Sequence, residues 1–382
     1  MNKVLIVQPW FSAVGHPAQS LLNTARILGK QAEFIYIVSI EPATTGIVVS
    51  VEPGATGIEA SLAKLAEYAR VITFTVASAS LREGTFKAIQ QLRCLFRNEK
   101  MKGSILFFDA HLVLLSALWG SWTHIPEVSR LGVIYLIGPE RIKSSRLASW
   151  LVKRFISRPE VVLYLRTEEL VSAWHEAFPS VNAAHIRHMP SLEIPEDGLT
   201  FPEPVKTTLL KFGIVGQIRR GKGLEYLVPL FQRHPHLGKL TVAGTFNNPA
   251  ERAALPELAD FPGFIDIFLS ENDLLQQVAN QDYLLMLYSN WDERMESAVL
   301  YLAARANRPV ITYNKGWCGR LVAQFNCGLF APPERSALKE FLSMLPKPGE
   351  AEYQQLLAGI QQFRINYSGG HAKSAFLKAL LE

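Results

Sequence analysis

The chain has 382 residues, of which 48% are hydrophobic and 19% charged, and its formal net charge at pH 7 is +5. This composition is typical of an ordered globular protein and excludes long disordered stretches. Because single hydrophobic cores stop growing beyond about 250–300 residues, we expect two domains. The charge is mild and the basic residues are spread over both halves, so nucleic acid is not an expected partner.

The three cysteines, Cys94, Cys318 and Cys327, do not have the spacing of metal ligands, and an odd number does not complete a disulfide framework. They favour a reducing compartment. The apolar run at residues 4–7 is too short for the core of a signal peptide, and no run of about 18 uncharged apolar residues predicts a membrane span. We therefore expect a cytoplasmic protein, and a peripheral position at the membrane stays open.

Strands and helices are expected to alternate in the first half of the chain. Apolar runs predict strands at residues 4–7, 34–40, 71–76, 105–108, 133–137 and 161–165. Between them, apolar residues at helical spacing predict helices at 18–28, 81–96 and 141–156. This alternation is typical of a parallel doubly wound sheet.

A proline-containing break at residues 189–204 separates the two halves and predicts an interdomain linker. A second series follows, with strands expected at 209–215, 240–242, 264–269, 284–288 and 310–312, and a helix at 298–306. The predicted fold is α/β, with two Rossmann-like doubly wound domains that face a cleft. They cover residues 1–195 and 205–365. Residues 366–382 are expected to form a C-terminal helix, whose return to the N-terminal domain stays open.

A basic glycine loop follows the strand expected at 209–215 and precedes a helix. It contains three glycines and three cations: Gly216, Gly221, Gly223, Arg219, Arg220 and Lys222. Glycines let backbone N–H groups approach an anion, a helix N-terminus favours negative charge, and cations add charge-assisted hydrogen bonds, so the loop suits a phosphate. It is neither a Walker loop nor a Gly-x-Gly-x-x-Gly motif. A tight turn with solvated cations stays open as the alternative.

Ligands of doubly wound sheets bind beyond the carboxyl ends of the strands, so polar residues there are functional candidates. In the N-terminal domain these are Gly15 and His16 after the first strand, and Asp109 and His111 after the strand at 105–108. A histidine in such a loop is also commonly a cap or packing residue, and an aspartate commonly serves a turn or an N-cap. Both interpretations stay open for each residue.

A second anion site is predicted where the helix at 298–306 begins, because a helix N-terminus attracts negative charge. Glu296, Ser297 and Ala298 stand at this start. Ser297 also has an ordinary interpretation, as the N-cap or first-turn residue of the helix.

With these positions assembled, the chain resembles the GT-B glycosyltransferases, especially the retaining group-1 enzymes of glycosyltransferase family four. Residues 216–223 are similar to that family's Gly-Arg…Lys-Gly diphosphate loop, and residues 297–332 to its donor-binding helix, Pro-Val strand and glycine-containing tail. Asn307 stands where the family usually has a glycine, and asparagine tolerates the left-handed conformation that ends a helix. The match covers the C-terminal domain well and the N-terminal domain loosely, through Gly15 and His111.

The resemblance implies roles for the matching residues. Lys222 would hold the donor diphosphate, and His111 occupies the place of a family histidine that contacts the donor sugar. The family's arginine position is Gln217 here, so Arg219 or Arg220 would supply the positive charge. The catalytic candidates are therefore His111, Lys222 and Arg219. The donor-binding candidates are Gly216, Arg220, Gly221, Gly223, Glu296, Ser297 and Ala298.

A larger departure concerns the family's paired glutamates. Their positions correspond to Leu302 and to Arg294, which has Glu293 beside it. Leucine cannot hydrogen-bond a ribose. Either Glu296 and Ser297 hold the donor at the helix start, or catalysis is weakened or absent.

The implied reaction moves a sugar from a nucleotide diphosphate sugar to a hydroxyl of a glycan, a lipid-linked saccharide or a small molecule, with retention. Cations and helix N-termini would stabilise the leaving diphosphate, so no metal and no cofactor besides the donor is expected. Gly15, His16 and Asp109 are the acceptor-side candidates. The alternative, favoured by Leu302 and Gln217, is a non-catalytic module that binds a nucleotide sugar or a partner protein. A sugar-nucleotide epimerase or phosphorylase is less supported, because no phosphate-cofactor lysine signature is found.

Cations are dense between residues 130 and 158, where Glu140 is the only acid. They are Arg130, Arg141, Lys143, Arg146, Lys153, Arg154 and Arg158. We expect this region to contact an anionic surface, which a lipid-linked acceptor would make useful. Solvation of an ordinary charged surface is the alternative.

Overall fold

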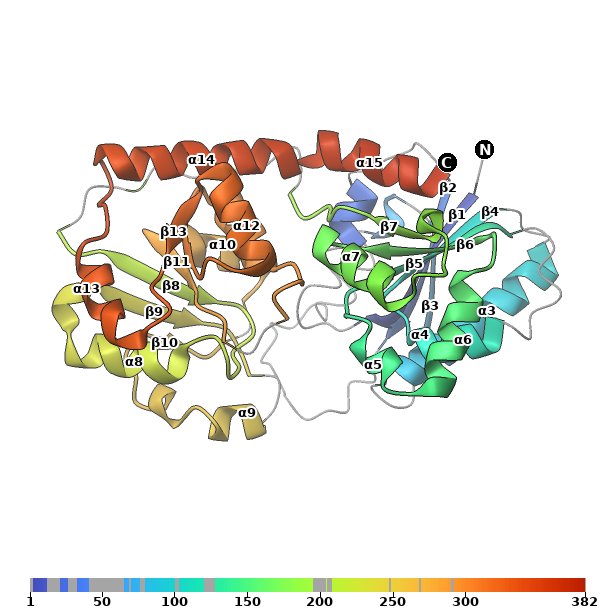
Figure 1. Cartoon of the computed structure of the whole chain (residues 1–382), viewed down its shortest axis with the longest axis horizontal. Coiled ribbons are helices and arrows are strands. Elements are labelled where there is room, and N and C mark those ends of the chain that lie inside the picture. Colours follow the sequence, from blue (N-terminus) through green and yellow to red (C-terminus); the bar gives the residue numbers. More distant parts are fainter. Residues whose placement is uncertain are drawn as a thin grey trace. The chain divides into compact units, whose positions relative to one another are not determined.

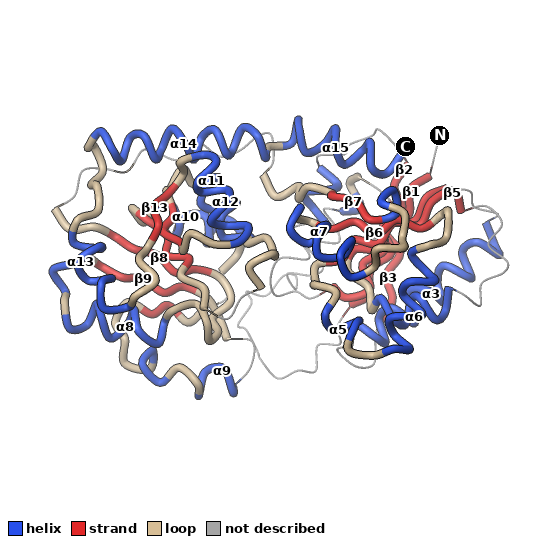
Figure 2. The backbone as a smooth tube through the Cα atoms, in the orientation of Figure 1, coloured by secondary structure: helices blue, strands red, loops and turns tan. Residues whose placement is uncertain are grey.

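The computed structural model describes residues 3–11, 21–26, 33–40, 65–68, 70–75, 80–99, 103–119, 128–194, 204, 208–246, 249–267, 269–289 and 292–381. The chain divides into two compact units, Met1–Pro195 with Gly369–Glu382, and Glu196–Ser368. Each unit is a parallel β-sheet with helices packed on it (Figures 1 and 2). The expected α/β class, with two doubly wound sheets, is confirmed.

The sheet of the first unit has the strand order β3-β2-β1-β4-β5-β6-β7, and all neighbouring pairs are parallel. Its strands are β1 (Lys3–Phe11), β2 (Glu33–Ile40), β3 (Arg70–Thr75), β4 (Gly103–Phe108), β5 (Val128–Tyr135), β6 (Val161–Leu165) and β7 (Ile186–His188). The central strands are apolar throughout because helices cover both faces of the sheet. In β4, for example, Ile105 and Phe107 pack into one core, and Leu106 and Phe108 into the other.

One face of this sheet is covered by α3 (Leu81–Glu99), α4 (Leu112–Trp119), α6 (Arg146–Ile156) and α7 (Glu168–Ala177). The other face packs against helical residues 21–26 and α15 (Gly369–Leu381), which contributes Ala372 and Phe376. The prediction of a single helix at 141–156 is wrong. The segment is divided into α5 (Glu140–Lys143) and α6, because Ser145 has an extended backbone and its side chain accepts a hydrogen bond from the Ala148 N–H.

The second unit has the strand order β10-β9-β8-β11-β12-β13, also parallel throughout. Its strands are β8 (Lys211–Val215), β9 (Lys239–Ala243), β10 (Phe264–Ile265), β11 (Tyr283–Met286), β12 (Val310–Thr312) and β13 (Gly328–Phe330). The strand expected at 264–269 is thus shorter than predicted, and the short strands β7 and β13 were not expected.

Seven helices of the second unit are described: α8 (Leu224–Arg233), α9 (Pro249–Ala253), α10 (Glu271–Ala279), α11 (Ala298–Arg305), α12 (Gly316–Phe325), α13 (Leu338–Ser343) and α14 (Ala351–Tyr367). Asn307, just after α11, has φ 54°, so the expected left-handed asparagine at this helix end is confirmed. After α14 the backbone of Ser368 is extended, and α15 follows in the first unit. Within the described residues, no helix is both long and apolar enough to cross a membrane.

Candidate functional site

Each sheet has one point where the strand order reverses, between β1 and β4 in the first unit and between β8 and β11 in the second. Doubly wound sheets bind ligands beyond the carboxyl ends of the strands at such points. The basic glycine loop connects β8 to α8, and the segment ending at Ser297 connects β11 to α11. In the first unit, Asp109 and His111 connect β4 to α4. Gly15 and His16 lie outside the described residues.

The three glycines of the loop are all in the left-handed region, with φ 85° at Gly216, 84° at Gly221 and 81° at Gly223. Side chains rarely adopt this conformation, so the loop needs glycine there. Gly223 precedes the first residue of α8, and a Cβ on it would lie 3.1 Å from the carbonyl oxygen of Leu287. Among the described residues, no group accepts a hydrogen bond from the N–H of Gly221, Lys222 or Gly223. The sequence therefore folds into a turn whose amides are available to an anion.

Lys222 is buried beneath this turn, with 6% of its surface exposed. Its Nζ donates a hydrogen bond of 2.8 Å to the carbonyl oxygen of Val215, the last residue of β8. Burial, and to a smaller extent the nearby Arg219, lowers its pKa to about 7. The lysine side chain thus holds the loop to the strand and is poised to gain a proton when negative charge approaches.

The two arginines of the loop differ in their surroundings. Arg219 is half-buried, and burial lowers its pKa, with Tyr288 and Glu251 acting in the opposite direction. Arg220 is exposed, and its Nε donates to the carbonyl oxygen of Ala254 at 3.3 Å. Its backbone N–H donates to Glu251 Oε2 at 3.1 Å. Arg219 is therefore the loop arginine that lies close to Lys222.

The β11–α11 connection is joined to the glycine loop. The Ser289 N–H donates to the carbonyl oxygen of Gly221 at 2.8 Å. Ser297 occupies the N-cap position of α11, but its hydroxyl does not cap the helix. Its Oγ lies 3.2 Å from the hydroxyl of half-buried Tyr288, within hydrogen-bond distance. Burial raises the pKa of Tyr288 far above its usual range, so this phenol stays protonated. The sequence offered no signal for Tyr288 beyond its place at a strand end.

Two further tyrosines join the loops of the second unit and were not expected as site residues. The hydroxyls of Tyr226 on α8 and Tyr313 after β12 are 3.0 Å apart. The guanidinium of Arg335 lies 4.5 Å from the centre of the Tyr226 ring. Burial and the hydrogen bond with Tyr313 raise the pKa of Tyr226 far above the usual value of a tyrosine. This polar pair ties the first turn of α8, next to the glycine loop, to the end of β12.

In the first unit, Asp109 follows β4 with φ 53°, a value that aspartate and asparagine tolerate better than most residues. Its N–H donates to the carbonyl oxygen of Ile134, and its carboxylate Oδ1 is buried with no hydrogen-bond partner among the described residues. Burial raises its pKa to about 6. A buried carboxylate oxygen without a donor is suited to accept one from a ligand.

His111 caps the N-terminus of α4. Its Nδ1 accepts a hydrogen bond of 3.2 Å from the N–H of Leu114, so the proton of the neutral ring lies on Nε2. Its own N–H donates to Thr85 Oγ1 at 2.9 Å. The cap interpretation of His111 is thus confirmed, and Nε2–H is left as its second polar group.

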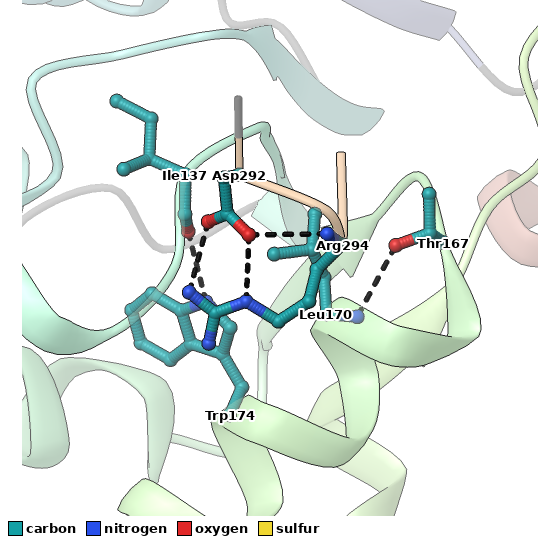
Figure 3. A network of polar contacts seen from close by, with 6 residues as sticks. All are labelled: Ile137, Thr167, Leu170, Trp174, Asp292 and Arg294. Atoms are coloured by element: carbon teal, nitrogen blue, oxygen red, sulfur yellow. Dashed lines mark hydrogen bonds and ion pairs between the residues drawn. The ribbon is translucent and has the colours of Figure 1, made fainter. Parts of the chain in front are cut away.

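Behind this loop, Tyr135 and Trp174 pack edge to face with ring centres 5.8 Å apart. The Trp174 indole donates to the carbonyl oxygen of Ile137 at 3.1 Å, and α7 is capped by Thr167, which accepts from the N–H of Leu170 (Figure 3). Burial and the nearby Asp109 raise the pKa of Tyr135 to about 12. These contacts fix the wall beside Asp109.

No family model matches the chain, and no curated protein matches it in sequence. Solved structures match over its whole length. HepE from Anabaena in complex with UDP has a TM-score of 0.67 at 13% identity, covering 100% of this chain and 99% of HepE. Sucrose-phosphate synthase from Thermosynechococcus elongatus gives 0.62 at 14% identity, covering 100% and 96%. WaaG, a glycosyltransferase involved in lipopolysaccharide biosynthesis, gives 0.63 at 12% identity, covering 99% and 100%.

The fold is GT-B. The fold expected from the resemblance is therefore confirmed, whereas the roles of single residues rest on this chain's own geometry. In this GT-B chain the glycine loop lies at the reversal point of the second unit, and the Asp109–His111 loop lies at that of the first.

Arg294 and Leu302 stand at the positions of the family's paired glutamates. Arg294 makes a two-pronged ion pair with Asp292, with Nε and one terminal nitrogen each 2.8 Å from a carboxylate oxygen (Figure 3). This hydrogen bonding lowers the pKa of Asp292. Leu302 is half-buried on α11 and offers no polar atom. Glu296, which precedes the N-cap residue Ser297, accepts from the Tyr301 hydroxyl at 3.0 Å.

A pocket of about 20 Å³ opens beyond β11 and β12 in the GT-B chain, room for about one water molecule. Glu293 at its edge forms a 2.7 Å ion pair with Lys315. The lining residues are Met286, Tyr288, Glu293, Met295, Thr312, Tyr313, Lys315 and Cys318. The pocket thus lies at the carboxyl ends of strands, next to the β11–α11 connection.

Proposed function

We propose that this chain is a glycosyltransferase that transfers a sugar from a nucleotide diphosphate sugar to an acceptor hydroxyl, with retention and without a metal ion. The observation that carries the proposal is the 216–223 loop. It places buried Lys222, half-buried Arg219 and backbone amides without a partner among the described residues together at the reversal point of a GT-B sheet. This is the chemistry required to hold a diphosphate and to stabilise the charge that grows on it as the sugar leaves.

The loop would bind the diphosphate through three kinds of donor. The amides of Gly221 and Gly223 supply hydrogen bonds, and the N-terminus of α8 supplies a favourable dipole. Lys222 and Arg219 supply positive charge. Since the Lys222 pKa is about 7 without a ligand, an incoming diphosphate would favour its charged form and draw in a proton.

In the first unit, His111 and Asp109 would have different roles. His111 presents Nε2–H as a donor to a hydroxyl or to the leaving group, while Nδ1 keeps the ring in place on α4. Asp109 would accept a hydrogen bond from a hydroxyl of the acceptor through Oδ1, which no described residue contacts by a hydrogen bond. The acceptor class we propose is a glycan or a lipid-linked saccharide.

The solved neighbours support a uridine diphosphate donor. HepE binds UDP, and also UDP with glucose, and a protein from E. coli that matches at a TM-score of 0.66 with 12% identity binds UDP-2-fluoro glucose. We therefore place UDP-hexoses first among the donors to test.

A non-catalytic nucleotide-sugar module is the second candidate. It is favoured by Leu302 at the second glutamate position and by the engagement of Arg294 with Asp292 at the first. Such a module would bind the donor through the same loop but release no nucleoside diphosphate.

The deciding experiment combines thermal shift with detection of released nucleoside diphosphate. The full chain is mixed with UDP-, GDP-, ADP- and dTDP-sugars, alone and with a mixture of glycan and lipid-linked acceptors. Stabilisation with release supports the transferase, and stabilisation without release under every acceptor supports the binding module. Absence of both stabilisation and release with all donors contradicts the two candidates together.

A further inference from the structure

One face of α6 exposes apolar and cationic side chains together. Leu147 is 66% exposed and Trp150 is 54% exposed, although both are large and apolar. Arg146, Lys153 and Arg154 are exposed on the same side, because residues three, four and seven positions apart share a helix face. We call these five residues the α6 face.

The α6 face is held rigidly by the rest of the first unit. The opposite side of α6 buries Val152, Phe155 and Ile156 in the core, and Ser145 caps the helix. Figure 1 shows α6 beside α4, against which it packs. Arg154 lies over Trp150, with its guanidinium 5.5 Å from the ring centre. The exposed apolar residues are therefore part of a formed helix surface.

Three of the seven cations expected at 130–158 lie on this face, and others in the region have local contacts. Lys143 donates to the carbonyl oxygen of Ala177 at 3.2 Å, and Arg158 pairs with Glu160 at 2.6 Å. Arg130 is half-buried and hydrogen-bonds Tyr164. None of the cations on the α6 face forms an ion pair with a described residue, and neither do exposed Arg141 and Lys143. Their charge is available to an external partner.

We propose that the α6 face docks on the surface of an anionic phospholipid bilayer. Tryptophan prefers the interface between headgroups and acyl chains, leucine enters the acyl boundary, and lysine and arginine reach the acidic headgroups. A soluble polyanion would use the three cations but would leave Leu147 and Trp150 without a function. The inference is independent of the transfer reaction, since it rests on a surface of the first unit alone.

The expected binding is reversible. Each cation near an acidic leaflet strengthens binding about fivefold, which is about 1 kcal/mol. Three cations and two apolar side chains form a peripheral contact, far weaker than a spanning helix. Raising the salt concentration should therefore release the protein, because screening shortens the reach of the charges.

Vesicle sedimentation with the full chain tests the proposal. We expect binding to vesicles of phosphatidylcholine with phosphatidylglycerol at low salt, and none to pure phosphatidylcholine. Changing Arg146, Lys153 and Arg154 together to serine should lower binding on the order of a hundredfold. Leu147→Ser with Trp150→Ser should lower it at least fivefold while leaving the melting temperature unchanged.

Matched controls come from exposed residues of the second unit. Arg233, Lys339 and Lys347 changed to serine remove the same charge, and Met344→Ser removes an apolar side chain that is 68% exposed. These controls should retain binding. Equal losses in the control triple would show that only net charge matters and would overturn the proposal. So would unchanged binding in the Leu147 and Trp150 variant, which would indicate a general polyanion surface.

A second copy of the chain is the other occupant to exclude. Light scattering of the full chain without lipid should show the same mass before and after Trp150→Ser. A dimer that dissociates on this substitution, with no binding to anionic vesicles, would contradict docking on a bilayer.

Discussion

The Nζ atom of Lys222 donates a hydrogen bond to the carbonyl oxygen of Val215, 2.8 Å away, so the loop cation is fixed to the strand that precedes the loop. Both residues are buried, and no carboxylate is needed to hold the lysine there. An ammonium held in this way needs little reorganisation when charge develops on a diphosphate above it. This arrangement makes Lys222 the most direct test of the proposed reaction.

Lys222→Ala should lower turnover about a hundredfold to a thousandfold, by analogy with removal of one preorganised electrostatic donor. Affinity for nucleoside diphosphate should fall less, because the interaction strengthens in the transition state. Turnover per folded molecule and calorimetric affinity measure the two effects. Lys239→Ala, an exposed lysine on β9, is the control that should behave like the parent. If Lys222→Ala binds and turns over donor like the parent, the loop is an ordinary turn.

The lowered pKa of Lys222 gives a second prediction. Its ordinary pKa is 10.5, and in the folded protein it is about 7, so between these values the unfolded chain binds more protons. The free energy of unfolding should therefore rise with pH across this window. A bound diphosphate favours the ammonium, so binding at pH 8 should take up close to one proton. Calorimetry in buffers of different ionisation enthalpy measures this uptake, and Lys222→Met should abolish it.

Substitutions of the two loop arginines should differ in their effect on donor binding and turnover. Arg219→Ala should weaken donor binding and turnover by about tenfold to a hundredfold, the worth of a charge-assisted hydrogen bond. Arg220→Ala should change either by less than about threefold, because Arg220 is exposed and its side chain bonds Ala254. Steady-state kinetics of both variants decide the matter. The reverse order would assign the family arginine's part to Arg220.

The fold could be predicted from the sequence because strands buried on both faces are continuous apolar runs, as β4 and β6 are. The position of the glycine loop followed from the same pattern. Strands of three residues, such as β7 and β13, leave too short a pattern to recognise. The break before α6 was missed because a serine that caps a helix does not interrupt the apolar spacing on either side.

The site was predictable only in part, because its contacts join residues distant in sequence. The Ser289 N–H and the carbonyl oxygen of Gly221, which belong to different connections, are brought within 2.8 Å by the fold. The burial of Lys222 and the left-handed backbone of Asp109 depend on neighbouring strands, which local sequence does not specify. The sequence could name these residues as candidates, but it could not show what each one contacts.

His111 has two separable roles: Nδ1 caps α4, and Nε2–H has no hydrogen-bond partner within the described part of the chain. His111→Asn should keep the cap, since asparagine is a good N-cap residue, and should therefore keep the melting temperature. It should lose turnover, because its side chain is too short to replace Nε2–H. His111→Ala should lose both, with stability falling about 0.5–2 kcal/mol. Thermal melts and kinetics of the pair separate the two roles; full activity in His111→Asn would leave the cap as the whole function.

Replacing Asp109 should change stability and activity in opposite directions: stability should rise and turnover should fall. Burial raises its pKa from an ordinary 3.8 to about 6, so the folded protein binds more protons than the unfolded chain between these values. Stability contributed by the protonated carboxyl is complete below pH 3.8 and is lost as the pH rises through 6. Asp109→Asn removes the buried charge and tolerates the left-handed backbone. The variant should be more stable than the parent at pH 8, by up to about 3 kcal/mol.

Denaturant unfolding of parent and variant at pH 4 and pH 8 measures the effect, and the gain should nearly vanish at pH 4, where the parent's carboxyl is protonated in the folded chain. Turnover should fall, since an amide cannot take a proton or hold a hydroxyl as a carboxylate does. Asp260→Asn, an exposed carboxylate in the second unit, controls for the lost surface charge. An Asp109→Asn variant that is less stable at pH 8 would mean that the ionised carboxylate has a native partner and is held for structure.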